Sequence, residues 1–190
     1  MARPKSEDKR NAILAAAIHV IATQGLGAPT ARIAKTAGVA EGTLFTYFDN
    51  KDELLNALYL AIKAELREAL APDFPHDAGM RERARHLWRH YVDWGVANPD
   101  KRKVMLVLSA SERVTEQSRA VGMQAFAEAG ALIGHCIAQG HLDGHSPAFA
   151  SAIMGALAET TMDFIVREPA QRERYLEAGF NAFWNAIAHA

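Results

Sequence analysis

The feature that most constrains the fold of this chain is a helix-turn-helix pattern over residues 30–51, TARIAKTAGVAEGTLFTYFDNK. Ala34 is small enough for two short helices to cross closely, and Gly38 suits the left-handed residue at which the first helix ends. Leu44 is placed to point from the second helix toward Ile33, in the core that the two helices share. The spacing therefore predicts the unit that places its second helix in the major groove of DNA.

The outward side of the second predicted helix carries hydroxyls and rings rather than a row of charges. These side chains are Thr43, Phe45, Thr46 and Tyr47. Hydroxyls hydrogen-bond base edges, a ring packs on a thymine methyl group, and a tyrosine hydroxyl reaches a phosphate oxygen. We expect Thr30 to cap the first helix near a phosphate, and Lys51 to contact another phosphate. The alternative is an ordinary amphipathic helix, because this spacing also occurs by chance.

Residues 13–55 resemble the DNA-binding domain of the TetR/AcrR family of bacterial transcriptional repressors. The matching segments are ILAAAIHVIATQG, TARIAKTAGVAEGTLFTYF and DNKDELL, whereas the rest of the chain resembles the family only in length and helical character. The resemblance implies DNA contacts from the start of the second helix, the third helix and the lysine after it. At the matching positions these residues are Thr30, Arg32, Glu41, Gly42, Thr43, Phe45, Thr46, Tyr47 and Lys51.

Two of these positions depart from the family pattern. Glu41 stands where a basic or polar residue is common, and its charge repels phosphates, so we expect it to face a cytosine amino group or solvent. Phe45 replaces a frequent tyrosine and therefore has no hydroxyl with which to bond a phosphate.

The overall charge gives no positive field to attract nucleic acid, since 21 Lys and Arg face 22 Asp and Glu for a net charge of −1. Basic residues nevertheless gather before the first helix, where only Glu7 and Asp8 oppose them. They are Arg3, Lys5, Lys9 and Arg10. Such an arm can lie along phosphates or in a minor groove, and the alternative is a frayed, solvated terminus.

The single cysteine, Cys136, excludes an internal disulfide and fits a reducing cytoplasm. We see no export signal, because His19 interrupts the apolar stretch 13–21 and mixed charges precede it. No apolar run is expected to approach the roughly 20 residues of a membrane span. The sequence predicts a soluble, cytoplasmic protein.

Helical periodicity without strand alternation predicts an all-α fold of about nine helices. Residues 1–50 are expected to form a three-helix DNA-binding domain, and residues 51–190 a helical ligand-binding and dimerisation domain. A helix from residue 51 to about 70 should join them. The expected breaks lie at residues 25–29, 38–41, 49–50, 72–79, 98–99, 111–115, 140–147 and 168–169.

Apolar and aromatic residues at helical spacing in the second domain can line a cavity for a small organic ligand. The candidates are Trp88, Tyr91, Met105, Met123, Phe126, Met154, Thr161 and Phe164. The alternative is that they simply fill the core, which is the commoner role of such stripes.

Two stripes of mostly small residues on the last helices predict a four-helix dimer contact, an arrangement that the family resemblance also implies. They consist of Ala152, Gly155 and Glu159, and of Tyr175, Gly179, Ala182 and Ala186. The alternative is tight packing within one chain.

The histidines predict neither a metal site nor catalysis. His86 and His90 lie among arginines that would repel a cation, and no motif-spaced carboxylate accompanies either these two or the group His135, Cys136, His141 and His145. We also see no nucleophile elbow, phosphate loop or paired-carboxylate site, and expect no cofactor.

The sequence thus predicts a homodimeric repressor that leaves a palindromic DNA operator when a small apolar or amphipathic effector binds. Two alternatives remain open, a helical protein-interaction module without DNA binding and a small-molecule enzyme.

Overall fold

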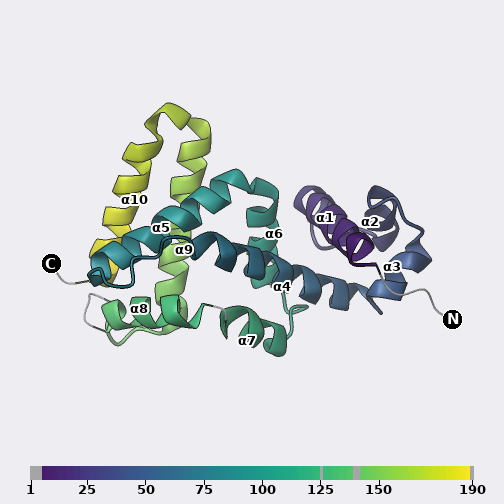
Figure 1. The fold of residues 1–190 in the computed structure, drawn as a ribbon, viewed down its shortest axis with the longest axis horizontal. Coiled ribbons are helices and arrows are strands. Elements are labelled where there is room, and N and C mark those ends of the chain that lie inside the picture. Colours follow the sequence, from purple (N-terminus) through teal and green to yellow (C-terminus); the bar gives the residue numbers. More distant parts are fainter. Residues whose placement is uncertain (1–5, 125, 139–141, 189–190) are drawn as a thin grey trace. The chain divides into compact units, whose positions relative to one another are not determined.

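The computed structural model describes residues 6–124, 126–138 and 142–188, and within them the chain forms ten α-helices, one 3-10 turn and no strand. The all-α prediction is confirmed (Figure 1). In chain order the elements are α1 (Glu7–Gln24), α2 (Thr30–Thr36), α3 (Glu41–Tyr47), α4 (Lys51–Leu70), α5 (Met80–Ala97), α6 (Pro99–Ser109), α7 (Glu116–Gln124), α8 (Ala127–Ile137), α9 (Pro147–Arg167), the 3-10 turn η1 (Pro169–Gln171) and α10 (Arg172–Ile187).

The expected helix count was one short, because the segment after residue 115 is divided into α7 and α8. Phe126 interrupts the helical backbone there, with φ −114° and ψ 17°, and precedes α8 as its N-cap residue. Neither glycine nor proline lies between Met123 and Phe126, so the local sequence contains no signal for this break.

The chain forms two compact units. The first contains residues up to Glu65 together with Asn98–Gln124, and the second contains Leu66–Ala97 together with Ala125–Ala190. The first unit therefore holds α1, α2, α3, α6, α7 and most of α4. The second holds the end of α4 with α5, α8, α9 and α10.

The packing of α2 and α3 in the first unit follows the predicted spacing. Ile33 and Leu44 are both fully buried and Ala34 is 2% exposed, so the two helices share a core with α1. Gly38 has φ +68°, the left-handed conformation that its position required. The amide of Val39 then donates to the carbonyl of Ala34 at 3.0 Å, which closes the turn.

One expected helix cap is wrong. Thr30 is the first residue of α2, and Pro29 occupies the N-cap position without a side-chain capping bond. The carbonyl of Pro29 accepts from the amides of Arg32 and Ile33, as expected of the residue in the N-cap position. At α4 a side chain does cap the helix, because the side-chain oxygen of Asn50 accepts from the amide of Glu53 at 2.9 Å.

The turn after α6 is attached to the first turns of α4. Arg113 Nε lies 2.5 Å from Asp52 Oδ1, and Asn56 Nδ2 donates to the Arg113 carbonyl at 2.9 Å. Asn56 Oδ1 in turn accepts from the amide of Thr115 at 2.9 Å. One side-chain amide therefore satisfies both a donor and an acceptor of this turn.

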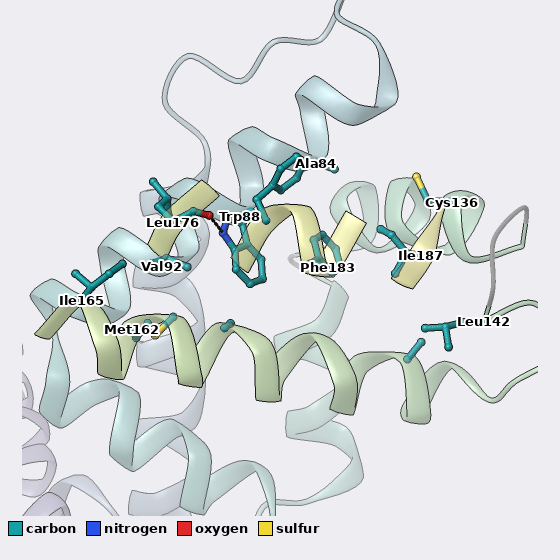
Figure 2. Close-up of a cluster of buried hydrophobic side chains, with 13 residues drawn as sticks. Ala84, Trp88, Val92, Cys136, Leu142, Met162, Ile165, Leu176, Phe183 and Ile187 are labelled. Atoms are coloured by element: carbon teal, nitrogen blue, oxygen red, sulfur yellow. Dashed lines mark hydrogen bonds between the residues drawn. The ribbon is translucent and has the colours of Figure 1, made fainter. Parts of the chain in front are cut away.

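The core of the second unit is built from α5, α8, α9 and α10 around Trp88 (Figure 2). The Trp88 indole stacks on the Phe183 ring with centroids 5.3 Å apart, and its Nε1–H donates to the Leu176 carbonyl at 3.2 Å. Gly179 lets α10 approach closely, since a Cβ added there would lie 2.3 Å from Thr161 Oγ1 and 2.8 Å from Trp88 Cζ2.

Arginines of α5 face acceptors of α10 in an antiparallel series. Arg85 contacts both carboxylate oxygens of Glu177 at 2.9 and 2.8 Å, and Arg89 contacts Glu173 at 2.7 Å. In the last pair of the series the charges are exchanged between the helices, because Arg172 belongs to α10 and its partner Asp93 belongs to α5. A slip of α10 by one turn would bring carboxylates together, so this reversal favours the observed register.

Helix α9 corrects the expectation of no long apolar run. Residues Phe149–Arg167 have a mean hydropathy of 1.3, long and apolar enough for a membrane span by length and composition alone. This helix packs against α5 and α10 and buries Ala158, Met162 and Ile165 in the core of the second unit. Within the described chain 28% of this segment is buried, so much of its apolar surface is exposed.

Candidate nucleic-acid interface

The short helix α3 has one buried and one exposed side. Leu44 is fully buried, whereas Phe45 is 40% exposed. Glu41, Gly42 and Thr46 are also exposed, and Thr43 and Tyr47 are partly so. The side chains predicted to read DNA are therefore presented to solvent, while the leucine fixes the helix to the core.

A hydrogen bond joins the starts of α2 and α3. The hydroxyl of Thr30 donates to Glu41 Oε1 at 2.6 Å. Both residues were predicted to contact DNA separately, and the structure brings them together. The sequence offered no sign of this pair, because the two residues lie on different helices and follow no common period.

Tyr47 and Lys51 are tied to backbone groups of the same unit. The Tyr47 hydroxyl accepts from the amide of Ser6 at 3.0 Å, which links α3 to the residue preceding α1. Lys51 Nζ donates to the Ala28 carbonyl at 2.6 Å, which links the start of α4 to the turn before α2. Arg32 is exposed on α2.

The electrostatic surroundings of Lys51 are mixed. Burial, and after it the positive charge of Arg113, lowers the pKa of the Lys51 ammonium, and the nearby Asp52 carboxylate opposes this shift. An added phosphate would act in the same direction as Asp52, because an opposite charge favours the protonated form.

A depression of about 550 Å³ lies beside Tyr47 in the first unit. Its lining is mainly apolar, and the charged residues in it are Arg10 and Glu53. The Arg10 guanidinium lies 5.6 Å from the centroid of the Phe48 ring. The lining consists of Arg10, Tyr47, Phe48, Glu53, Asn56, Ala57, Leu60 and Ala61. Of the basic arm, Arg3 and Lys5 lie outside the described residues.

The predicted ligand residues divide between the two units. Met105 and Met123 belong to the first, and the other six belong to the second. Trp88 and Thr161 are buried, with the Thr161 hydroxyl donating to the Leu157 carbonyl at 2.8 Å. Tyr91, Phe126 and Met154 are partly exposed, and Phe164 is 38% exposed.

The small-residue stripes of α9 and α10 keep most of their members at the surface. Ala152 and Ala182 are exposed, and Gly155, Glu159, Tyr175 and Ala186 are partly so. Gly179 differs from the rest, because a side chain at this position would overlap Thr161 and Trp88 of the same chain. Helices α9 and α10 run side by side (Figure 1).

The histidine pair on α5 is a stacked pair, with the rings of His86 and His90 3.9 Å apart at their centroids. His86 Nε2 lies 3.3 Å from the Leu70 carbonyl. Burial first, and then His90, lowers the pKa of His86. Among the described residues no group of three or more potential metal ligands is found, and His141 lies outside them.

Cys136 is 3% exposed, and burial raises the pKa of its thiol. A buried thiol that resists ionisation is a poor nucleophile, as expected for a packing residue.

Comparison with known proteins gives the family. Residues 13–58 match the model of bacterial regulatory proteins of the tetR family. Among curated proteins, the chain is 36% identical over 72 residues to a fatty acid metabolism regulator protein of Bacillus subtilis, covering 37% of each chain. It is 32% identical over 98 residues to an HTH-type transcriptional regulator of Haemophilus influenzae, covering 51% of this chain and 52% of that one. The matches thus span about half or less of these relatives.

Solved structures extend the similarity over almost the whole chain. A tetR family transcription regulator from Shewanella sp. PV-4 is 30% identical, with a TM-score of 0.82, over 96% of this chain and 99% of that one. LfrR from Mycobacterium smegmatis, solved with proflavine, shares the fold at 20% identity and a TM-score of 0.64, over 97% and 99% of the two chains. With the exposed α3 and the buried helix-turn-helix core, these matches show that the chain belongs to the TetR family of DNA-binding transcriptional regulators.

Proposed function

We propose that this regulator is a homodimeric repressor that leaves a palindromic or near-palindromic operator when a small apolar or amphipathic molecule binds it. The observation that carries the proposal is the two-sided character of α3, in which Leu44 is buried while Glu41, Phe45 and Thr46 face solvent. In this proposal residues 1–50 bind DNA, and residues 51–190 bind the effector and form the dimer.

A dimer fits the size of the reading surface. Helix α3 has only seven residues and therefore reaches few base pairs, so a second copy in the next major groove doubles the contacts. Exposed Ala152 and Ala182 on neighbouring helices would allow the backbone of a partner helix to approach. Gly179 is left out of this contact, because it packs within its own chain.

The effector class is inferred from composition and from the relatives. Partly exposed Tyr91, Phe126 and Met154 offer apolar surface with one hydroxyl. One relative is named a fatty acid metabolism regulator protein, and LfrR was solved in complex with proflavine. Both support a ligand with a large apolar part.

The response to effector is proposed as a population shift. Effector would favour a conformation in which α4 has moved and two α3 helices no longer match successive grooves. The course of α4 supports it as the moving element, since Lys51–Glu65 belong to the first unit and Leu66–Leu70 to the second. Only a difference in effector affinity between the two conformations can drive the change.

The test is selection of bound fragments from a random DNA pool with purified protein. A palindromic enriched sequence supports the repressor dimer. The affinity of the protein for that sequence should fall steeply as salt concentration rises, because Lys and Arg displace counterions from phosphates. A pool without any enriched sequence would favour the protein-interaction module.

The TetR family comprises transcription regulators and is not a class of enzymes. We place this one in the cytoplasm, where bacterial DNA lies. Turnover of a bound effector would favour the enzyme alternative.

A further inference from the structure

We propose that the exposed side of α3 selects its operator by accepting hydrogen bonds from base amino groups, with Glu41 reading a cytosine and Thr30 positioning Glu41. This inference rests on the proposed operator binding and specifies the bases that are recognised.

The Glu41 carboxylate accepts hydrogen bonds and, when ionised, donates none. In the major groove the guanine O6 and N7 atoms and the thymine O4 atom are also acceptors, so they repel it. Cytosine N4 and adenine N6 carry the amino groups that remain. Adenine places its N7 acceptor beside N6 on the same base, whereas cytosine presents only the amino group. Cytosine is therefore the base that suits Glu41.

Thr30 fixes the direction of this carboxylate. Its hydroxyl donates to Glu41 Oε1 at 2.6 Å, and Oε2 is left to meet a base. Because a hydroxyl has one proton, Thr30 cannot donate to a phosphate from its side chain while it holds Glu41. The role of Thr30 is thus to position an exposed glutamate whose side chain would otherwise rotate freely.

Thr46 is a second acceptor on the same side. Its hydroxyl donates to the Gly42 carbonyl at 3.1 Å, which leaves only lone pairs toward DNA. Phe45 lies between Glu41 and Thr46 in the sequence and is 40% exposed. Its apolar ring is suited to contact a thymine methyl group. The surface combines two acceptors with one ring.

The donors come from the last residue of α3 and the first residue of α4. Tyr47 accepts from the Ser6 amide, so its own proton remains available for a phosphate. Lys51 has three N–H donors and gives one to Ala28. Phosphates are acceptors, and this division places donors against the backbone and acceptors against the bases.

The experiment compares sequences selected from one random DNA pool by the wild-type protein and by Glu41→Gln, Thr30→Val and Glu68→Gln variants. Glu68 is exposed on α4 and serves as the matched charge control. Wild type and Glu68→Gln should enrich the same half-site with a cytosine at one position. Glu41→Gln should prefer adenine there, since an amide pairs with both N6 and N7, and should bind the cytosine site about tenfold more weakly.

Thr30→Val keeps the shape of the side chain and removes the hydroxyl. It should lower the ratio of the affinities for half-sites with and without the cytosine, whereas a merely structural defect would weaken binding to both half-sites alike. An unchanged half-site with Glu41→Gln, or a wild-type half-site without cytosine, overturns the inference and leaves operator binding intact. A wild-type pool with no enriched sequence overturns both.

Discussion

At the scale of single residues, the helix-turn-helix depends on one backbone conformation and one buried side chain. Gly38 and Leu44 could be assigned from sequence because turn chemistry and helical spacing are local properties. The pairs Thr30–Glu41 and Asn56–Thr115 could not, since hydrogen bonds between distant residues leave no periodic pattern. Thr30 was assigned as a cap because threonine favours that position, and the proline before it took the place instead.

Replacement of Gly38 tests the left-handed turn. Gly38→Ala should lower the free energy of unfolding by about 1–2 kcal/mol, because φ +68° brings a Cβ against the following carbonyl. Gly42→Ala is the matched control. Its added Cβ meets no atom within 4 Å inside α3, so helix propensity should stabilise it by up to about 1 kcal/mol. Urea unfolding measures both, and equal stability of the two variants would contradict the assignment.

Replacement of Lys51 tests its contact with phosphate. Lys51→Gln retains an N–H donor for the Ala28 carbonyl but carries no charge. The slope of log affinity against log salt on the selected operator should become shallower by about 0.9. Tyr47→Phe should weaken binding with little change of slope, because its bond is uncharged. An unaltered slope in Lys51→Gln would place this ammonium away from the phosphates.

At the scale of helices, sequence predicted the positions of most elements and missed the division between α7 and α8. The missed break lacks glycine and proline, so it depends on packing in the folded chain. Gly122 shows one such constraint on α7, because a Cβ there would lie 2.7 Å from Tyr59 Cε1 of α4. Requirements of this kind arise between distant helices and leave no local signal.

The close approach of α10 to α9 and α5 makes a measurable prediction. Gly179→Ala should destabilise the protein by about 1–3 kcal/mol, because the new methyl group overlaps Thr161 and Trp88. Gly134→Ala, at an exposed position of α8, is the control, with no atom within 4 Å of the added Cβ, and should not destabilise the protein. If thermal unfolding shows both variants to be as stable as wild type, α10 lies further from α9 than described.

The stacked histidines of α5 should make stability depend on pH. Burial and His90 lower the pKa of His86 in the folded chain, so the unfolded chain binds more protons as pH falls. The stabilisation is complete above the unfolded pKa of about 6.5 and is lost as pH falls below it. The free energy of unfolding should therefore fall between pH 7.5 and pH 5.5. The fall should be smaller in His86→Phe than in the wild-type protein. Identical pH profiles for the two proteins would contradict this.

At the scale of the whole molecule, the family and the all-helical fold follow from a motif covering about a quarter of the chain. The effector residues and the dimer surface were harder to predict, because an apolar stripe has the same composition whether it fills a core, lines a cavity or meets a partner. Trp88 illustrates this. Its aromatic ring at helical spacing suggested a ligand contact, and the structure shows an indole packed on Phe183 with its N–H satisfied.

The most direct measurement is the affinity and stoichiometry of the purified protein on its selected operator and on the same duplex with one half-site scrambled. We predict that two chains bind each intact operator, and that scrambling one half-site weakens binding at least about a hundredfold, because one recognition helix then loses its base contacts. Equal affinity for the two duplexes, or one chain bound per intact operator, would contradict the central claim that paired α3 helices read a palindrome.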